Sequence, residues 1–463
     1  MTALSLVAAL LAGCGSSEPV VLLADIAVDL YTPANVDAME GADELVVRVL
    51  DPWGEVLAFG SGTPDEGVAL SELQDVGIVV IEVQARSEGE VVSAGRSTPI
   101  IIDEAGTPEV SILFLPVNKA VELVYRPDRY RLGHLTVTTV DHKVLLIGGR
   151  SPSSDTVHDS STWFDPLVGF FPGSVQMPRP TYGMSEVVLG DGSRLVTGGI
   201  DVHGDPVADA WTLMPDAGRL DGVNPMPNPR SEHCLAHTQE SAALAVGGLV
   251  EPQFAVDGVR NDGSGNLEWT QYLMDDLVAA DVSGCIGPGD GWVLTVGASP
   301  DAWGVMDRRL SSNDDLPESW RPLGTPMPGL EGAHLVLRGG DVYVFGGYDA
   351  GRSRAGTEGY RVDFQRAEAI QEPSLVVPRA WGEWRWWSDE ILVFAGGYDD
   401  ALQVRAVYDV EFFDIRGSTK LIVPVPVREA RLEMMQGGAI ALLGGLRDDG
   451  FPSGAWMVMP WME

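Results

Sequence analysis

The residues best suited to bind a ligand are five arginines that recur at intervals of about fifty residues or a multiple of fifty. They are Arg129, Arg179, Arg230, Arg379 and Arg428, and each follows or lies near a proline. A guanidinium group offers a planar fork of donors that binds carboxylate or phosphate in a bidentate manner. One interpretation is a ring of arginines that receives such a ligand. The alternative is that each arginine pairs with acids or carbonyls inside the protein.

A second feature with chemical meaning is a short apolar run near the start of the chain. It extends from Leu4 and ends in Leu11-Ala12-Gly13-Cys14, and it is too short to span a bilayer. This ending resembles the lipobox of bacterial lipoproteins. The resemblance implies a signal peptide over residues 1–13, a lipidated (palmitate-bearing) Cys14 and a tether over residues 14–19. An ordinary secretory signal is the alternative, and the lack of Lys or Arg before the run leaves the true start of the chain open.

The elements that must position the arginines are strands ending in a glycine pair, which recur along the second part of the chain. The first glycines are Gly148, Gly198, Gly247, Gly297, Gly346, Gly396 and Gly444, and in the fourth repeat Ala298 stands in place of the second glycine. A period near fifty, with an aromatic strand after each pair, resembles kelch repeats, in which each repeat is one four-stranded blade. The resemblance implies a seven-bladed kelch-like β-propeller over residues 118–463. The last repeat lacks a fourth strand, so we predict that the segment from Ala120 to Tyr125 supplies it and closes the ring.

Residues 20–117 read as a separate all-β unit. Short runs rich in Val, Ile and Leu alternate there with turn sequences such as Asp51-Pro52-Trp53-Gly54. About seven short strands in one hundred residues fit a small β-sandwich, similar to Ig-like or transthyretin-like modules. The predicted fold class is therefore all-β, a sandwich followed by a propeller.

The repeat register also relates the two remaining cysteines. Cys234 and Cys285 occupy matching positions on the inner strands of adjacent repeats. Export would place them in an oxidising compartment, where a disulfide persists. The register permits a bond between them, and two buried free thiols are the alternative. A Cα separation above about 7 Å would exclude the bond.

The charge balance excludes several partner classes. The chain has 67 acidic and 30 basic residues, a net charge of −37. Nucleic acids and anionic lipid surfaces would repel such a protein. No other apolar run reaches the length of a transmembrane helix. We expect a monomer.

Signs of catalysis are few at the sequence level. Some kelch propellers are copper radical oxidases similar to galactose oxidase, which need two Tyr, two His and a Cys cross-linked to Tyr, and no comparable set is visible. His134, His233 and His334 resemble the structural kelch histidine. The acidic loops after the glycine pairs lack the Asp pattern of a Ca²⁺ site. No cofactor, metal ligand or catalytic residue is assigned.

These features predict a non-catalytic binding or scaffold lipoprotein of the bacterial envelope. It would lie at the outer membrane or cell surface, with the periplasmic face as an alternative, and bind a protein or glycan through its loops. Two alternatives stay open: a carbohydrate-active or other enzyme with its site at the channel mouth, and a structural surface module. An enzyme would show two carboxylates, or a carboxylate and a His, facing each other in the channel.

Overall fold

The computed structural model describes most of the chain from residue 21 to residue 462. The gaps are residues 24–25, 66–67, 69, 71–76, 103–108, 126, 140, 215–218, 240–241, 249–255, 262–266, 273–281, 289–291, 298–301, 308–318, 325–330, 349–353, 401–402 and 404. The predicted signal peptide, Cys14 and the tether lie outside the described residues. The described part is built of strands with one short 3-10 turn, η3 (Gln436–Gly438), and contains no α-helix. It therefore also has no helix capable of crossing a membrane.

From residue 120 onward the strands form seven four-stranded antiparallel sheets. The first three are β11 (Leu135–Thr138), β12 (Val144–Ile147), β13 (Ser160–Asp165) and β14 (Gly169–Gln176); β15 (Ser185–Val188), β16 (Arg194–Thr197), β17 (Ala210–Met214) and β18 (Arg219–Gly222); and β19 (Cys234–Gln239), β20 (Ala242–Val246), β21 (Val256–Asn261) and β22 (Leu267–Tyr272). The next three are β23 (Val282–Ile286), β24 (Trp292–Gly297), β25 (Gly304–Asp307) and β26 (Ser319–Pro322); β27 (His334–Arg338), β28 (Asp341–Phe345), β29 (Gly359–Asp363) and β30 (Glu368–Glu372); and β31 (Glu383–Trp386), β32 (Ile391–Ala395), β33 (Asp409–Asp414) and β34 (Thr419–Pro424).

The seventh sheet joins the two ends of this region. It contains β36 (Arg431–Met434), β37 (Ile440–Leu443), β39 (Ala455–Val458) and β10 (Ala120–Glu122), in the order β10-β39-β37-β36. The predicted fourth strand is confirmed, because β10 pairs with β39 with Val121 opposite Met457. A further two-stranded sheet pairs β35 (Val427–Arg428), which precedes β36 in the chain, with β38 (Leu446–Arg447), which lies between β37 and β39.

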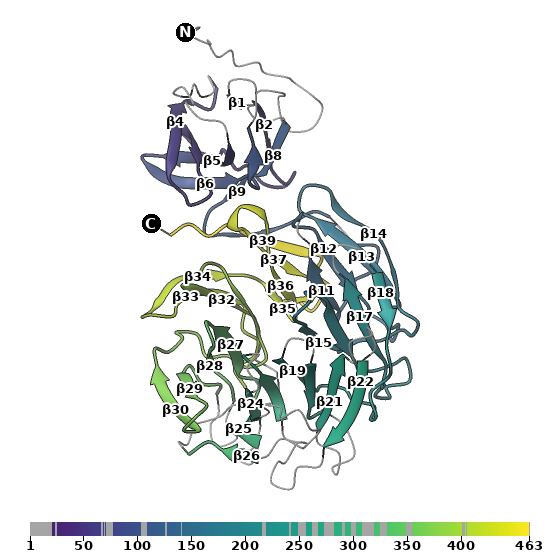
Figure 1. The fold of residues 1–463 in the computed structure, drawn as a ribbon. Coiled ribbons are helices and arrows are strands. Elements are labelled where there is room, and N and C mark those ends of the chain that lie inside the picture. The colour runs from purple at the N-terminus through teal and green to yellow at the C-terminus, as the bar shows by residue number, and fades with distance from the viewer. Residues whose placement is uncertain are drawn as a thin grey trace.

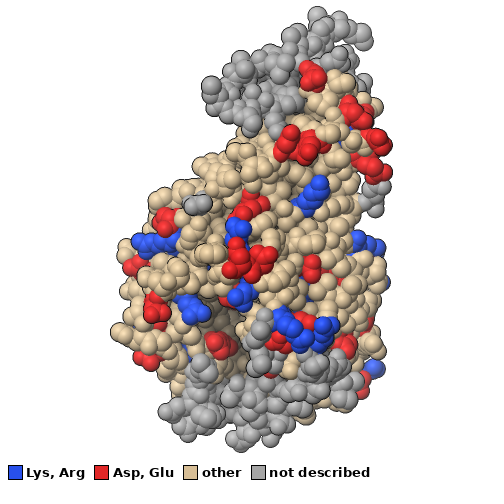
Figure 2. All heavy atoms as spheres, turned by 180° about the vertical axis from the view of Figure 1, so that it is seen from behind, with Lys and Arg blue, Asp and Glu red and all other residues tan. Residues whose placement is uncertain are grey.

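The sheets follow one another around a common centre in a propeller-like arrangement (Figure 1). First strands of successive sheets contact each other, β15 with β19, β19 with β23 and β23 with β27, and β36 contacts both β31 and β11. Side chains that point inward from different first strands therefore meet, although they are far apart in the sequence. On the face shown in Figure 2, acidic and basic side chains are interspersed in small groups rather than segregated by sign.

The glycine pairs permit the close packing of neighbouring sheets. Gly198 and Gly199 have φ of +61° and +106°, in the left-handed region that favours glycine. A Cβ atom on Gly198 would overlap the carbonyl oxygen of Arg230 and lie 2.6 Å from the ring of His233 in the next sheet. The pair is therefore required by both backbone conformation and space.

The N-terminal part has two sheets that share one apolar core, which includes Val28, Val47, Ile81 and Ile112. The three-stranded sheet is β1 (Val21–Leu23), β2 (Ile26–Tyr31) and β8 (Glu109–Leu113), with β2 parallel to β8. The other is β4 (Val56–Gly62), β3 (Glu44–Leu50), β5 (Ile78–Ser87), β6 (Glu90–Arg96) and β9 (Leu115–Pro116), with β7 (Ile100–Ile101) paired to β5.

The N-terminal part packs on the seventh sheet through a second apolar cluster. Ala94 and Leu115 contribute to it from one side, and Ala441 and Met457 from the other. The peptide nitrogen of Trp461 also donates to the Asn118 side chain at 2.7 Å. The two parts therefore share a packed junction (Figure 1).

Candidate functional site

The structure places two of the five predicted arginines in the protein interior. Arg230 and Arg379 have no exposed surface. Arg230 pairs with Asp257, with 2.8 Å between Nε and Oδ2, and donates to the carbonyl of Gly247 at 2.6 Å. Arg379 pairs with Glu411 at 3.4 Å and donates to the carbonyl of Gly396 at 3.2 Å. Both arginines therefore hold the glycine-pair turn of their own repeat and do not face a ligand.

The other three predicted arginines each contact a neighbouring side chain. Arg129 donates to the Ser160 hydroxyl at 3.2 Å, Arg179 pairs with Asp209 at 3.2 Å, and Arg428 donates to the Tyr398 hydroxyl at 3.3 Å. Each is partly exposed and has its own local partner.

In the first sheet, the buried arginine that holds the glycine-pair turn is Arg131, which was not predicted from the sequence. Like Arg230 and Arg379, it lies 17 residues before the glycine whose carbonyl it contacts, Gly148. This constant spacing of 17 residues was the available signal. Arg129, Arg179 and Arg428 do not have this spacing from the first glycines Gly148, Gly198 and Gly444.

The predicted disulfide cysteines are partly buried, and the predicted structural histidines are buried. The structure joins Cys234 and Cys285 in a disulfide that links β19 to β23, with 5.6 Å between the Cα atoms. His134, His233 and His334 are also buried. Burial is the main cause that lowers the pKa of His233 and of His334 to about 3, so both are neutral at ordinary pH.

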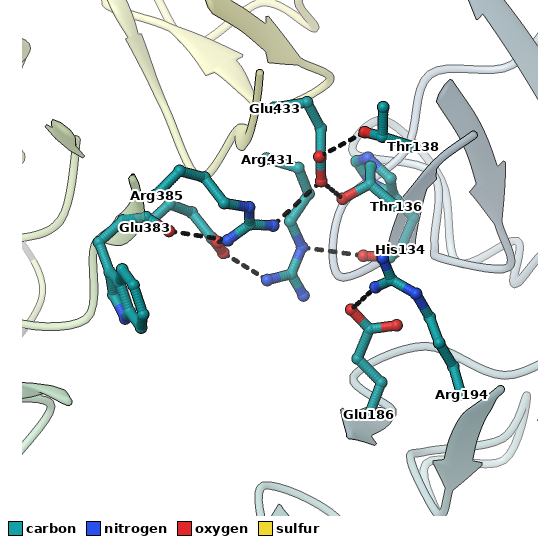
Figure 3. A network of polar contacts seen from close by, with 10 residues as sticks. His134, Thr136, Thr138, Glu186, Arg194, Glu383, Arg385, Arg431 and Glu433 are labelled. Atoms are coloured by element: carbon teal, nitrogen blue, oxygen red, sulfur yellow. Dashed lines mark hydrogen bonds and ion pairs between the residues drawn. The ribbon is translucent and has the colours of Figure 1, made fainter. Parts of the chain in front are cut away.

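A different set of charged side chains meets at the centre of the ring. We call it the central cluster, and its members come from the inner strands of four sheets (Figure 3). They are Thr136 and Thr138 of β11, Glu186 of β15, Arg194 of β16, Glu383 and Arg385 of β31, and Arg431 and Glu433 of β36.

Glu433 is the buried anchor of the central cluster. Its carboxylate accepts hydrogen bonds from Thr136 at 2.5 Å, Thr138 at 2.7 Å and Arg385 at 3.0 Å. Burial acts to raise its pKa, but Arg385 and the two threonine hydroxyls outweigh burial and hold the pKa below its ordinary value. Glu433 is therefore a fixed negative charge.

The two arginines of the cluster are oriented by carboxylates. Arg385 forms ion pairs with both Glu433 and Glu383, at 3.0 and 3.6 Å. A single guanidinium group therefore separates these two carboxylates. Arg431 pairs with Glu383 and donates to the carbonyl of His134 at 2.9 Å. The positions of both cations are thus set before any ligand arrives.

Glu186 is the member whose hydrogen bonding is incomplete. Its Oε1 pairs with Arg194 at 2.9 Å, whereas Oε2 is buried and has no hydrogen-bond partner in the described part of the protein. Burial is the main cause that raises the pKa of Glu186, partly offset by Arg194 and Arg385. Its side chain borders a cavity of about 270 Å³ that Thr136, Arg385 and Arg431 also line.

Arg431 additionally borders a second cavity of about 240 Å³ between the sixth and seventh sheets, lined also by Glu383 and Arg428. Arg431 therefore lines both cavities, whereas Arg385 lines the first alone.

The central cluster was not predicted from the sequence, although a signal existed. Glu383 and Arg431 each lie opposite the residue that precedes the first glycine of their repeat. The corresponding strands elsewhere are largely apolar, as in Leu335-Val336-Leu337. Charges on strands expected to be innermost mark a site, since unpaired buried charge is costly.

Comparisons with known proteins bear on the fold. No family model matches the chain, and no curated protein matches it. A solved structure described as a novel fungal alcohol oxidase with catalytic diversity among the AA5 family, in complex with copper, is similar. It shares 15% identity with a TM-score of 0.54, covering 74% of this chain and 75% of that chain. At this identity the likeness establishes the fold.

The residues of this chain do not fit a copper centre. Among the described residues no group of three His, Cys, Asp or Glu side chains could hold a metal ion. Cys234 and Cys285 are joined to each other, and the buried His134, His233 and His334 belong to three different repeats. These side chains therefore give no basis for a reaction step through copper.

The predicted non-catalytic scaffold role is corrected on these findings. The solved structure that resembles this chain is that of an alcohol oxidase, and the scaffold prediction is not retained. The centre of the ring also holds convergent carboxylates, Glu383 and Glu433 on one arginine. That arrangement is the one expected of an enzyme, and it was missed because its members lie in different repeats.

Proposed function

We propose that the protein is an enzyme whose active site is the central cluster, and that it moves a proton on a carboxylate-bearing sugar. Glu186 would exchange the proton, while Arg385 and Arg431 would hold the substrate carboxylate. One observation carries the proposal: the buried Glu186 Oε2 has no partner among the described residues, and the Glu186 side chain lines a cavity together with both arginines. A buried carboxylate oxygen without a partner costs stability, and carboxyl groups with a perturbed pKa are concentrated at functional sites.

The chemistry follows from charge. A C–H proton next to a carboxylate becomes acidic when the negative charge that develops on the carboxylate is stabilised, and two arginines would supply that stabilisation. Glu186 would then take the proton. In elimination, the C–H electrons form a double bond, the substituent on the next carbon departs with the electrons of its C–O bond, and its oxygen takes up the proton that Glu186 removed. In epimerisation, the same carbon takes up a proton from water on its opposite face.

A carboxyl group with a raised pKa suits this task, because proton transfer is most efficient when the pKa lies near the working pH. As a base, Glu186 must be ionised. The rate is therefore expected to rise with pH through the raised pKa of Glu186 and to level off above it.

The test is a screen of uronate oligosaccharides against neutral oligosaccharides of equal length. Solvent deuterium incorporated next to the carboxylate, or the ultraviolet absorbance of a new conjugated double bond, would report turnover. Glu186→Gln should lower the rate by about 10²–10⁴-fold, the usual contribution of a positioned base. Glu390→Gln, which alters an exposed carboxylate paired with Arg416, is the matched control. Unchanged turnover in Glu186→Gln would overturn the proposal.

We also propose a setting for this enzyme. The seven four-stranded sheets and repeated glycine pairs support a seven-bladed kelch-like propeller, and the two sheets sharing one core support a sandwich before it. The lipobox-like ending at Cys14 supports anchoring at the outer membrane or cell surface. Palmitate labelling that persists in Cys14→Ser would contradict that anchor.

A further inference from the structure

A third cavity lies at the junction of the N-terminal part and the seventh sheet. Its volume is about 360 Å³, within the range of about 300–1,000 Å³ typical of ligand pockets. Its lining includes Arg48, Arg86 and Arg96 from β3, β5 and β6, and also Trp387 and Trp461, but no acidic residue among those described. Three arginines without an acid form an unusual wall in a chain whose net charge is −37.

The positive charge of this wall is only partly compensated. Glu82 is opposite Arg48 in β3 and opposite Arg96 in β6, and it forms ion pairs with both, at 3.5 Å to Arg48. Arg86 instead donates to the neutral side chain of Gln84, at 2.8 and 3.1 Å. Among the described contacts around this cavity, one carboxylate therefore pairs with two of the three guanidinium groups, and the third contacts a neutral amide.

The cavity is built into a packed junction. Gly437 has φ of +72°, and a Cβ atom there would lie 2.6 Å from the backbone oxygen of Arg96. Ala94 of β6 belongs to the apolar cluster shared with the seventh sheet. The arginines are accessible as well, since the side chains of Arg48 and Arg96 are 36% and 44% exposed. Accessible cations held at a rigid junction are preorganised for an anion.

We propose that this cavity is a second binding site, separate from the central cluster, for an acidic sugar. The carboxylate of the sugar would lie among Arg48, Arg86 and Arg96, which bind such groups through paired donors. The apolar face of its ring would pack against Trp387 and Trp461, which offer flat apolar surface at the cavity wall. The charge selects an acidic sugar over a neutral one, and the aromatic wall selects a sugar ring over a small anion.

The experiment uses the full chain carrying Glu186→Gln, so that no turnover interferes. Isothermal titration calorimetry would compare trigalacturonate with the neutral trisaccharide maltotriose. Arg86→Gln removes one charge without breaking an ion pair. It should raise the dissociation constant of trigalacturonate at the junction site by about tenfold, equivalent to the loss of one charge-assisted hydrogen bond. Arg219→Gln, an exposed arginine paired with Asp221, is the matched control and should bind as the parent does.

Two further arms keep the result unambiguous. Arg431→Gln should remove binding at the central cluster and leave the junction site intact, so failure of the proposed active site would not affect this measurement. Trp461→Ala should also weaken the junction site, because it removes the aromatic ring from the cavity wall. The two hydrogen bonds between the backbone of residue 461 and the Asn118 side chain are retained in this variant. Equal affinity for the two trisaccharides, or unchanged binding in both Arg86→Gln and Trp461→Ala, would overturn the proposal.

Discussion

Two regions of this protein use the same residue types for opposite purposes. Arg230 with Asp257, and Arg379 with Glu411, are pairs with no exposed side-chain surface. The central cluster also joins arginines to carboxylates, but it borders cavities, and Glu186 Oε2 lacks a hydrogen-bond partner among the described residues. Residue type therefore does not distinguish a structural pair from a candidate active site. Access to a cavity does, since the Nε atom of the sealed Arg379 also lacks a hydrogen-bond partner among the described residues.

The difference has an energetic reason. A sealed ion pair resists the loss of either partner, because the remaining charge stays buried without compensation. A site for chemistry must instead leave some bonding capacity for the substrate, at a cost in stability. The two regions should thus respond oppositely to substitution.

The largest effect is expected at the sealed pairs. Asp257→Ala leaves Arg230 buried and without its carboxylate, so the free energy of unfolding should fall by about 3–5 kcal/mol. Equilibrium denaturation in guanidinium chloride would measure it. Asp221→Ala, which breaks an exposed pair with Arg219, should cost less than about 1 kcal/mol. Equal losses in the two variants would show that burial does not set the value of these pairs.

The disulfide between β19 and β23 is the next largest contribution. It closes a loop across a sequence separation of 51 residues, which restricts the unfolded chain. Replacing both Cys234 and Cys285 by Ala should lower the free energy of unfolding by about 2–4 kcal/mol. Thermal unfolding with and without a reducing agent offers an independent check. The double variant should no longer respond to the reducing agent, and a continued response would contradict the assignment.

The buried histidines should make stability depend on pH. The pKa values of His233 and His334 are about 3 in the folded protein, below the ordinary 6.5, so the unfolded chain binds more protons in this range. Their stabilising effect is complete above pH 6.5 and is lost as the pH falls toward 3, at about 1.4 kcal/mol per pH unit for each histidine. Denaturation of His334→Gln between pH 7 and 5 should show a shallower slope. His203→Gln, at an exposed loop position, should leave the slope unchanged.

The smallest and most discriminating effect concerns Glu186. Its pKa is raised above the ordinary 4.5, so its destabilising contribution grows as the pH rises from 4.5 through the raised value. Glu186→Gln should therefore fold with equal or slightly higher stability at pH 7, by less than about 1 kcal/mol, while losing activity. Urea denaturation at pH 4.5 and 7 would measure the difference. A loss of several kcal/mol at pH 7 would instead make Glu186 a structural residue like Asp257.

Much of the architecture could be predicted from local pattern. The glycine pairs near every fifty residues predicted the repeated sheets, because a left-handed backbone and a crowded strand end both require glycine wherever they recur. The missing fourth strand of the last repeat predicted that Ala120 and its neighbours would pair with β39. The alternation of apolar and polar residues in a strand, and the sequences of turns, involve only residues that are close in the chain. They can therefore be predicted from the sequence.

The site could not be read in this way. Thr136 and Glu433 form one hydrogen bond across 297 residues, and Arg385 and Glu433 one across 48. The sequence determined that arginines and carboxylates would recur in these repeats, but only the tertiary structure decided which became sealed and which stayed open to a cavity. The reason is that burial and partnership of a charge depend on side chains brought together from different sheets, and closure of the ring alone sets that neighbourhood.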